Sequence, residues 1–158
     1  MHPLLQSALF LEDIHNKRGW DQPPALYLFT VAPTNDRHEV REVQLASWLR
    51  GEVFDSVRFY RRAVGAAFHQ EPAPAPGLAA AVVVHETWVA MDAHPERQRV
   101  RVVVAGEPSG AFTLVQRTAL GNDLETRVSD RAGRGDMLAW EVSGLAATLS
   151  GEAMPALP

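Results

Sequence analysis

The chain has 158 residues, of which 46% are hydrophobic and 22% charged, and this composition of one globular domain excludes intrinsic disorder, collagen-like repeats and coiled coils. Nineteen acidic against fifteen basic residues give a formal net charge of -4, so we expect no general attraction to nucleic acid or to an anionic membrane. The absence of cysteine excludes disulfides, thiol chemistry and thiolate metal ligands.

The first predicted element is a helix that ends near Arg18. Its apolar residues recur at helical spacing, at Leu4, Ala8, Leu11 and Ile14. Gly19 supplies a C-cap, and the segment Gln22-Pro23-Pro24 forces extended backbone, so the helix cannot continue. Residues 25–32 then form a continuous apolar run bounded by prolines, which predicts a strand buried on both faces.

The next segments predict a short strand, a helix and a loop. A weak alternation over residues 40–45 favours a second strand. From Glu52 the apolar residues follow the 3.6-residue period of an amphipathic helix, at Val53, Val57, Tyr60, Val64 and Phe68. Residues 70–77 alternate proline with alanine, so we expect a polyproline II loop there.

The second half of the chain predicts mainly strands. Residues 78–89 form another continuous apolar run, interrupted only at His85-Glu86-Thr87, and this run predicts the central strand. Residues 99–104 and 112–116 flank a turn and predict an antiparallel hairpin. Residues 120–128 favour one further edge strand.

The C-terminal part predicts a last helix and a tail. Asp136 can cap a helix that Gly151 ends. The apolar face of this helix consists of Leu138, Val142, Leu145 and Leu149. We expect a single domain over residues 1–152 and a frayed tail over residues 153–158.

The predicted element order is α-β-β-α-β-β-β-(β)-α. Because the later strands are joined by hairpin-length connections, the order favours the α+β class, with a mainly antiparallel sheet and three helices. Similar orders occur in roadblock or profilin-like domains and in secretion-chaperone-like domains. This analogy rests on element order alone and transfers no function.

Two motifs carry a resemblance to known sequences. They are Gly-Trp-Asp-Gln-Pro-Pro-Ala-Leu-Tyr at residues 19–27 and His-Pro-Glu-Arg-Gln-Arg-Val-Arg-Val-Val at residues 94–103. With the hairpin and residues 144–149, the chain resembles a family of small, acidic, cytosolic actinobacterial proteins that have no assigned function. The resemblance implies a bacterial, cytoplasmic single domain, and it carries no catalytic residue.

The N-terminal segment, residues 1–18, has neither a basic n-region nor a small-residue cleavage site, so it does not match a signal peptide. No window approaches the roughly 18 consecutive apolar residues of a membrane span. We therefore expect a soluble protein without membrane contact, most simply in the cytoplasm.

The polar break in the predicted central strand is the most unusual local feature. A buried carboxylate or imidazole is unfavourable unless it is paired, so the break indicates either a site or a structural ion pair. His85 and Glu86 point to opposite faces of a strand and cannot act together directly. The ion-pair interpretation places Glu86 beside Arg99 or Arg101 of the neighbouring strand.

His94 and Arg97, in His94-Pro95-Glu96-Arg97, could contribute a metal ligand or an anion contact, although a turn shaped by the proline is the simpler interpretation. The six histidines do not fall at the three- or four-residue spacing of a helical zinc site. Gly-x-Ser-x-Gly and phosphate-loop motifs are absent. We therefore expect no metal, no cofactor and no catalytic serine.

The two doubly apolar strands, residues 25–32 and 78–84, need cover on both faces of the sheet. Three helices could divide between the two faces, or they could lie on one face while a second copy of the chain covers the other. Of these two arrangements we favour a homodimer.

Two functional hypotheses follow. The first is a non-enzymatic cytoplasmic module that binds a ligand or an unknown protein partner. The alternative is a small enzyme or ligand-binding protein with a polar pocket around Glu86, His94, Arg97 and Arg99. Convergence of these four side chains in one pocket would favour the alternative, whereas an ion-pair arrangement favours the module.

Overall fold

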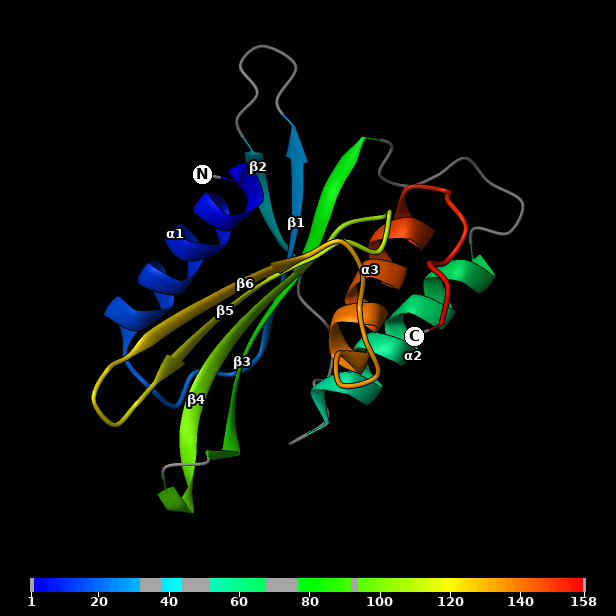
Figure 1. Cartoon of the computed structure of the whole chain (residues 1–158). Coiled ribbons are helices and arrows are strands. Elements are labelled where there is room, and N and C mark those ends of the chain that lie inside the picture. Colours follow the sequence, from blue (N-terminus) through cyan, green and yellow to red (C-terminus); the bar gives the residue numbers. More distant parts are fainter. Residues whose placement is uncertain (1, 32–37, 44–51, 68–76, 92–93, 158) are drawn as a thin grey trace.

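The computed structural model describes residues 2–31, 38–43, 52–67, 77–91 and 94–157. These residues form three helices and six strands, in an order that confirms the predicted α+β class and includes the further edge strand (Figure 1). The elements are α1 (Pro3–Arg18), β1 (Ala25–Val31), β2 (His38–Val43), α2 (Val53–Ala67), β3 (Leu78–Met91), β4 (His94–Gly106), β5 (Phe112–Thr118), β6 (Leu124–Ser129) and α3 (Met137–Leu149).

All six strands belong to one sheet with the order β2-β1-β3-β4-β5-β6, and every neighbouring pair is antiparallel. The β3–β4 hairpin has the longest of these pairings. Its register places Glu86 opposite Arg101 and Trp88 opposite Arg99. These four residues lie on one face of the sheet, because directly paired residues share a face and alternate residues of a strand return to it.

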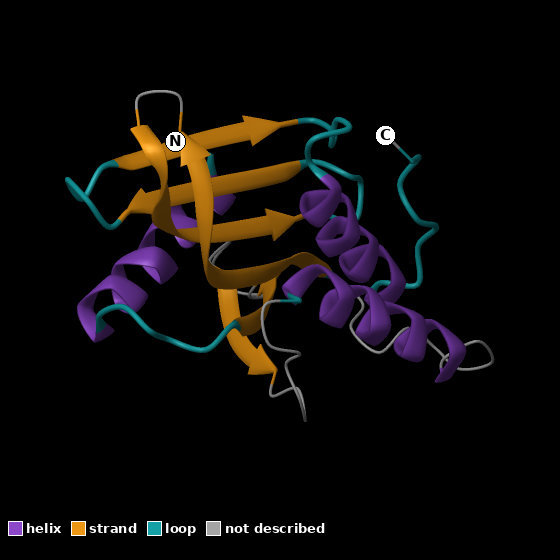
Figure 2. Ribbon diagram, turned by 90° about the horizontal axis from the view of Figure 1, so that it is seen from below, coloured by secondary structure: helices purple, strands orange, loops and turns teal. Residues whose placement is uncertain are grey.

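Helices of the same chain cover both faces of the sheet (Figure 2). One apolar layer joins α1 to residues such as Phe29, Val82 and Val103. The other joins α2 and α3 to residues such as Leu28 and Val83 on the opposite face. Burial of β1 and β3 on both faces is thus confirmed for residues 25–29 and 80–84. Because the cover comes from within the chain, the need for cover no longer argues for a dimer.

Helix α3 lies very close to the sheet where it crosses β4. A Cβ atom added to Gly106 would be 2.4 Å from the backbone nitrogen of Ser143. Only glycine therefore allows the helix backbone to approach the strand this closely. The Ser143 hydroxyl also donates a hydrogen bond to the Ala111 carbonyl, at 3.3 Å.

The cap expected at the start of the last helix differs from the structure. Asp136 makes no side-chain cap on α3, because its carboxylate accepts a hydrogen bond from the Gly133 N–H and pairs with Arg127 of β6. The tail, which the sequence predicts to be frayed, contacts α3 in the structure. Trp140 Nε1 donates to the carbonyls of Pro155 and Ala156, at 3.2 and 3.1 Å, which fixes the tail along α3.

Other expectations at element boundaries are also resolved. The strand expected over residues 120–128 begins at Leu124, because Gly121 and Asn122 have positive φ values of 82° and 57° and form a turn. The expected proline-rich loop lies outside the described residues up to position 76.

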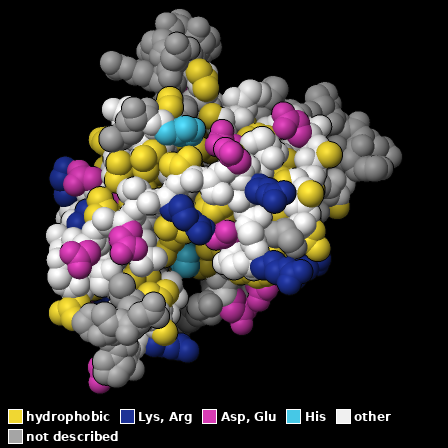
Figure 3. All heavy atoms as spheres, viewed as in Figure 1, with side chains coloured by type: hydrophobic (Ala, Val, Ile, Leu, Met, Phe, Trp, Pro, Cys, Tyr) yellow, Lys and Arg dark blue, Asp and Glu magenta, His cyan; other side chains and the backbone are white. Residues whose placement is uncertain are grey.

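Within the described ranges, none of the helices has the length and hydropathy of a membrane span. Acidic and basic side chains are intermixed on the face drawn in Figure 3.

Candidate functional site

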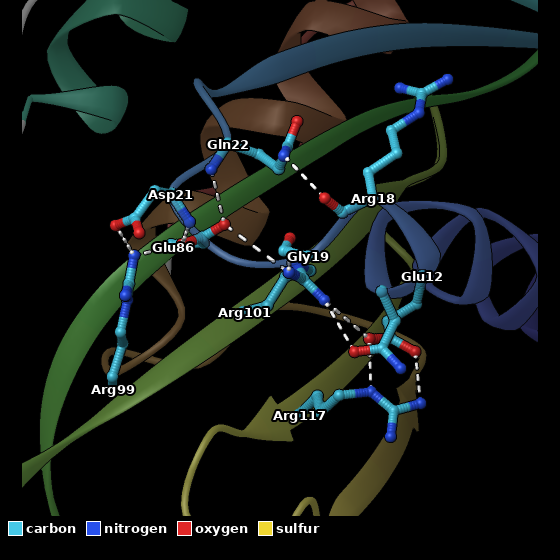
Figure 4. Close-up of polar contacts among 10 residues, drawn as sticks. Glu12, Arg18, Gly19, Asp21, Gln22, Glu86, Arg99, Arg101 and Arg117 are labelled. Atoms are coloured by element: carbon cyan, nitrogen blue, oxygen red, sulfur yellow. Dashed lines mark hydrogen bonds and ion pairs between the residues drawn. The ribbon is translucent and has the colours of Figure 1, made fainter.

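Glu86 forms the ion pairs with β4 that the polar break in β3 indicates. Its carboxylate oxygens lie 2.7 Å from Arg99 Nη2 and 3.6 Å from Arg101 Nη2. The same carboxylate accepts hydrogen bonds from the backbone N–H groups of Asp21 and Gln22, at 2.9 and 3.0 Å (Figure 4). Glu86 therefore attaches the loop after α1 to the β3–β4 hairpin.

Arg101 is fully buried and occupies the centre of this cluster. Its Nη2 donates to the Gly19 carbonyl at 2.6 Å, and its Nη1 lies 3.3 Å from Asn16 Oδ1 and 3.5 Å from Glu12 Oε1. The guanidinium carbon is 4.4 Å from the centre of the Trp20 ring. The half-buried Trp20 therefore lies against arginines of β4, and this contact gives the residues 19–22 a structural role.

Glu12 connects α1 to β5 and completes the cluster. Arg117 donates to it through Nε and Nη2, at 2.6 and 2.7 Å, in a bidentate arrangement. The hydrogen bonds to Glu12 raise the pKa of Arg117 above its ordinary value. We call Glu12, Asp21, Glu86, Arg99, Arg101 and Arg117 the ion-pair cluster; it connects α1 and the following loop to three strands.

The four predicted pocket residues are not all brought together. Glu86 and Arg99 pair, whereas Arg97 is exposed and makes no ion pair with the described residues. The side chain of His94 lies outside the described part of the structure. His85 is on the opposite face of the sheet, where burial lowers its pKa. Over the described ranges no three His, Asp or Glu side chains are grouped in a way that could hold a metal ion.

A groove of about 660 Å³ lies on the other side of α1, between this helix and strands β1 and β2. Helix α1 packs mainly on β3, β4 and β5, and the β1 side chains at the groove, Tyr27 and Phe29, are buried. The groove is lined by apolar side chains including Phe10, Leu11, Ile14, Phe29 and Val40. Phe10 is 64% exposed and Val40 is 48% exposed, so both leave apolar surface in contact with water at the groove.

The groove has a polar end near the C-terminus of α1. A smaller pocket of about 150 Å³ lies there, and both cavities are lined by Arg18, Tyr27 and Glu42. His15 also lines the smaller pocket, and its Nε2 lies 2.8 Å from the Tyr27 hydroxyl. Burial, together with the charges of Arg18 and Arg101, lowers the pKa of His15, and burial raises the pKa of Tyr27.

His15 retains an unused hydrogen-bonding atom. The residue is only 3% exposed, and its Nδ1 has no hydrogen-bond partner among the described residues. Such an atom is unfavourable in a buried environment unless something binds to it. His15 was not among the candidate residues predicted from the sequence. Its burial could have been predicted from the helical spacing, because His15 continues the buried stripe of Leu4, Ala8 and Leu11 as its polar member.

Comparisons with known proteins add no relative. No protein-family model, no curated protein and no solved structure matches this chain. The function is therefore inferred from the groove and the ion-pair cluster themselves.

Proposed function

We propose that this protein is a non-enzymatic binding module, and that its ligand is a small molecule with an apolar body and an oxygen-bearing polar end. The ligand lies in the groove between α1 and strands β1 and β2. The proposal needs no metal and no cofactor.

The observation that carries this proposal is the groove itself. Its volume of about 660 Å³ is within the roughly 300–1,000 Å³ typical of small-molecule sites. Aromatic and aliphatic side chains from a helix and two strands line it, so a bound apolar body would remove Phe10 and Val40 from water. Each square ångström of apolar surface buried in this way contributes about 25 cal/mol.

The polar end determines which head group fits. Because its pKa is lowered, His15 is neutral at neutral pH. When the Tyr27 hydroxyl donates to Nε2, the ring hydrogen resides on Nδ1, which is then a donor without an acceptor. An oxygen acceptor on a ligand that reaches the smaller pocket, which His15 lines, would satisfy Nδ1. At the same end Arg18 supplies a positive charge and Glu42 a negative one.

The ion-pair cluster supports the module over the small-enzyme alternative. Glu86 accepts two backbone hydrogen bonds and pairs with two arginines, so its carboxylate is fully engaged in holding the fold. Neither of the two cavities beside α1 is lined by Glu86, Arg97 or Arg99.

A fluorescence titration with 8-anilinonaphthalene-1-sulfonate tests the proposal, because this probe combines an aromatic body with an oxygen-bearing anion. We expect saturable binding to the folded wild type and a loss of at least tenfold in affinity for Phe10→Arg. Phe59→Arg is the matched control, since Phe59 is a 75% exposed phenylalanine on α2, away from the groove. Equal affinities for the two variants would refute the groove as the site.

A further inference from the structure

Strand β6 is an outer strand of the sheet, and among the described strands it pairs with β5 alone. Every residue from Leu124 to Val128 is exposed. Leu124 and Val128 are large apolar side chains that are 41% and 45% exposed. An exposed edge that carries apolar side chains is a template for pairing with another strand.

The backbone of β6 is arranged for such pairing. The Thr118 N–H donates to the Asp123 carbonyl at 2.9 Å, so residues 118 and 123 form a hydrogen-bonded pair. Because hydrogen-bonded and non-bonded pairs alternate in an antiparallel ladder, Glu125 and Arg127 also bond towards β5. The backbone N–H and C=O groups of Leu124, Thr126 and Val128 therefore point outward in the plane of the sheet, away from β5.

The side chains of β6 are complementary to a second, antiparallel copy of the same strand. If Thr126 lies on a two-fold axis, it faces its own copy. Glu125 then faces Arg127 of the other copy on one face of the sheet. Leu124 faces Val128 of the other copy on the opposite face. Cross-strand pairs of opposite charge and of apolar residues are the pairs that stabilise antiparallel ladders.

We propose that the protein forms a homodimer through β6, with Thr126 at the two-fold axis. The two six-stranded sheets then form one continuous antiparallel sheet. The outward N–H and C=O groups of the three alternating residues supply the backbone hydrogen bonds. The groove beside α1 is not part of this interface, so the dimer and the proposed ligand binding are independent.

The other outer strand, β2, is the competing interface. Glu39 and Arg41 would also be complementary about Val40. Val40, however, lines the groove, and β2 lacks the flanking apolar pair that Leu124 and Val128 supply. The observations therefore favour β6.

Sedimentation equilibrium tests the interface at concentrations up to about 500 µM, where even a weak dimer is populated. We expect the wild type to approach twice the chain mass of 17.3 kDa. Glu125→Arg places two arginines opposite each other, and Thr126→Pro removes an outward N–H that the monomer does not use; both variants are expected to sediment as monomers. Glu39→Arg, the same charge change on β2, is expected to remain dimeric.

A mixing experiment separates lost pairing from lost folding. Arg127→Glu and Glu125→Arg chains are complementary to each other and not to themselves, so an equimolar mixture should contain heterodimers by native mass spectrometry. Arg127→Glu also breaks the ion pair with Asp136, so its folding is checked by circular dichroism. A monomeric wild type, a dimeric Glu125→Arg or a monomeric Glu39→Arg would each overturn the proposal.

Discussion

Glu12 of α1 and Arg117 of β5 are joined by two hydrogen bonds of 2.6 and 2.7 Å, although they are 105 positions apart in the chain. Glu12 also lies 3.5 Å from the fully buried Arg101, so one carboxylate balances two guanidinium groups. This contact attaches the N-terminal helix to the middle of the sheet.

Replacing Glu12 with alanine is therefore expected to destabilise the fold severely. The change leaves Arg101 as a buried charge without a close carboxylate on α1, and breaking a buried ion pair on one side typically costs about 3–5 kcal/mol. Chemical denaturation measures this loss. Asp13→Ala is the control, because the Asp13–Lys17 pair is exposed and its removal should change stability by less than about 1 kcal/mol.

Trp20→Ala should destabilise the protein by about 1–3 kcal/mol, since the half-buried ring packs on Arg101 and Arg99 and contributes cation–π attraction as well as buried area. A thermal melt measures the effect. Trp88→Ala is the matched control, because Trp88 lies on β3, next to the arginines of β4, and is 60% exposed. Equal melting temperatures for the two variants would show that Trp20 does not stabilise the cluster.

Gly106→Ala should unfold or severely destabilise the protein, because the added Cβ would overlap the backbone of α3 at Ser143. Gly65→Ala is the counterpart within α2, where the added Cβ would meet only a methyl group of Thr148 at 3.7 Å. This second change should stabilise the helix by about 0.5–1 kcal/mol. Urea midpoints for the two variants are expected to move in opposite directions.

The stability should depend on pH through His15. Its folded pKa lies below the ordinary value of 6.5, so the unfolded chain binds the proton more readily than the native state does. The contribution of neutral His15 to the free energy of unfolding is therefore fully present above pH 6.5, and it is lost as the pH falls through the folded pKa of His15. His15→Gln should reduce the dependence of the unfolding free energy on pH below pH 6.5. If the slope of unfolding free energy against pH is the same in this variant as in the wild type, the lowered pKa of His15 is contradicted.

Patterns within one or two neighbouring elements predicted most of the fold. The helix stripe of α1, its end at Gly19 and the pairing of Glu86 with β4 all depend on local spacing or on adjacent strands of a hairpin. The partners of Glu12 could not be predicted in this way. The partners are Arg101 and Arg117, which lie 89 and 105 positions further along the chain. Their contact with Glu12 depends on where α1 packs across the sheet.

The groove was also beyond sequence reasoning, for a related reason. Apolar strands show that both faces need cover, but they do not show which strands each helix covers. Because α1 packs mainly on β3, β4 and β5, its outer side and strands β1 and β2 line the groove, with the buried side chains of Tyr27 and Phe29 among the lining residues. Phe10 lies outside the predicted stripe of Leu4, Ala8, Leu11 and Ile14, and only the packing shows that it lines the groove.

The most direct test of the proposed binding site is an amide chemical-shift map of the isotope-labelled protein titrated with 8-anilinonaphthalene-1-sulfonate. We predict that the largest shifts fall on Phe10, Ile14, His15, Tyr27 and Phe29, and that they saturate together with the fluorescence. Shifts concentrated around Glu86 and Arg99, or scattered without saturation over the surface, would contradict the assignment of the groove as the binding site.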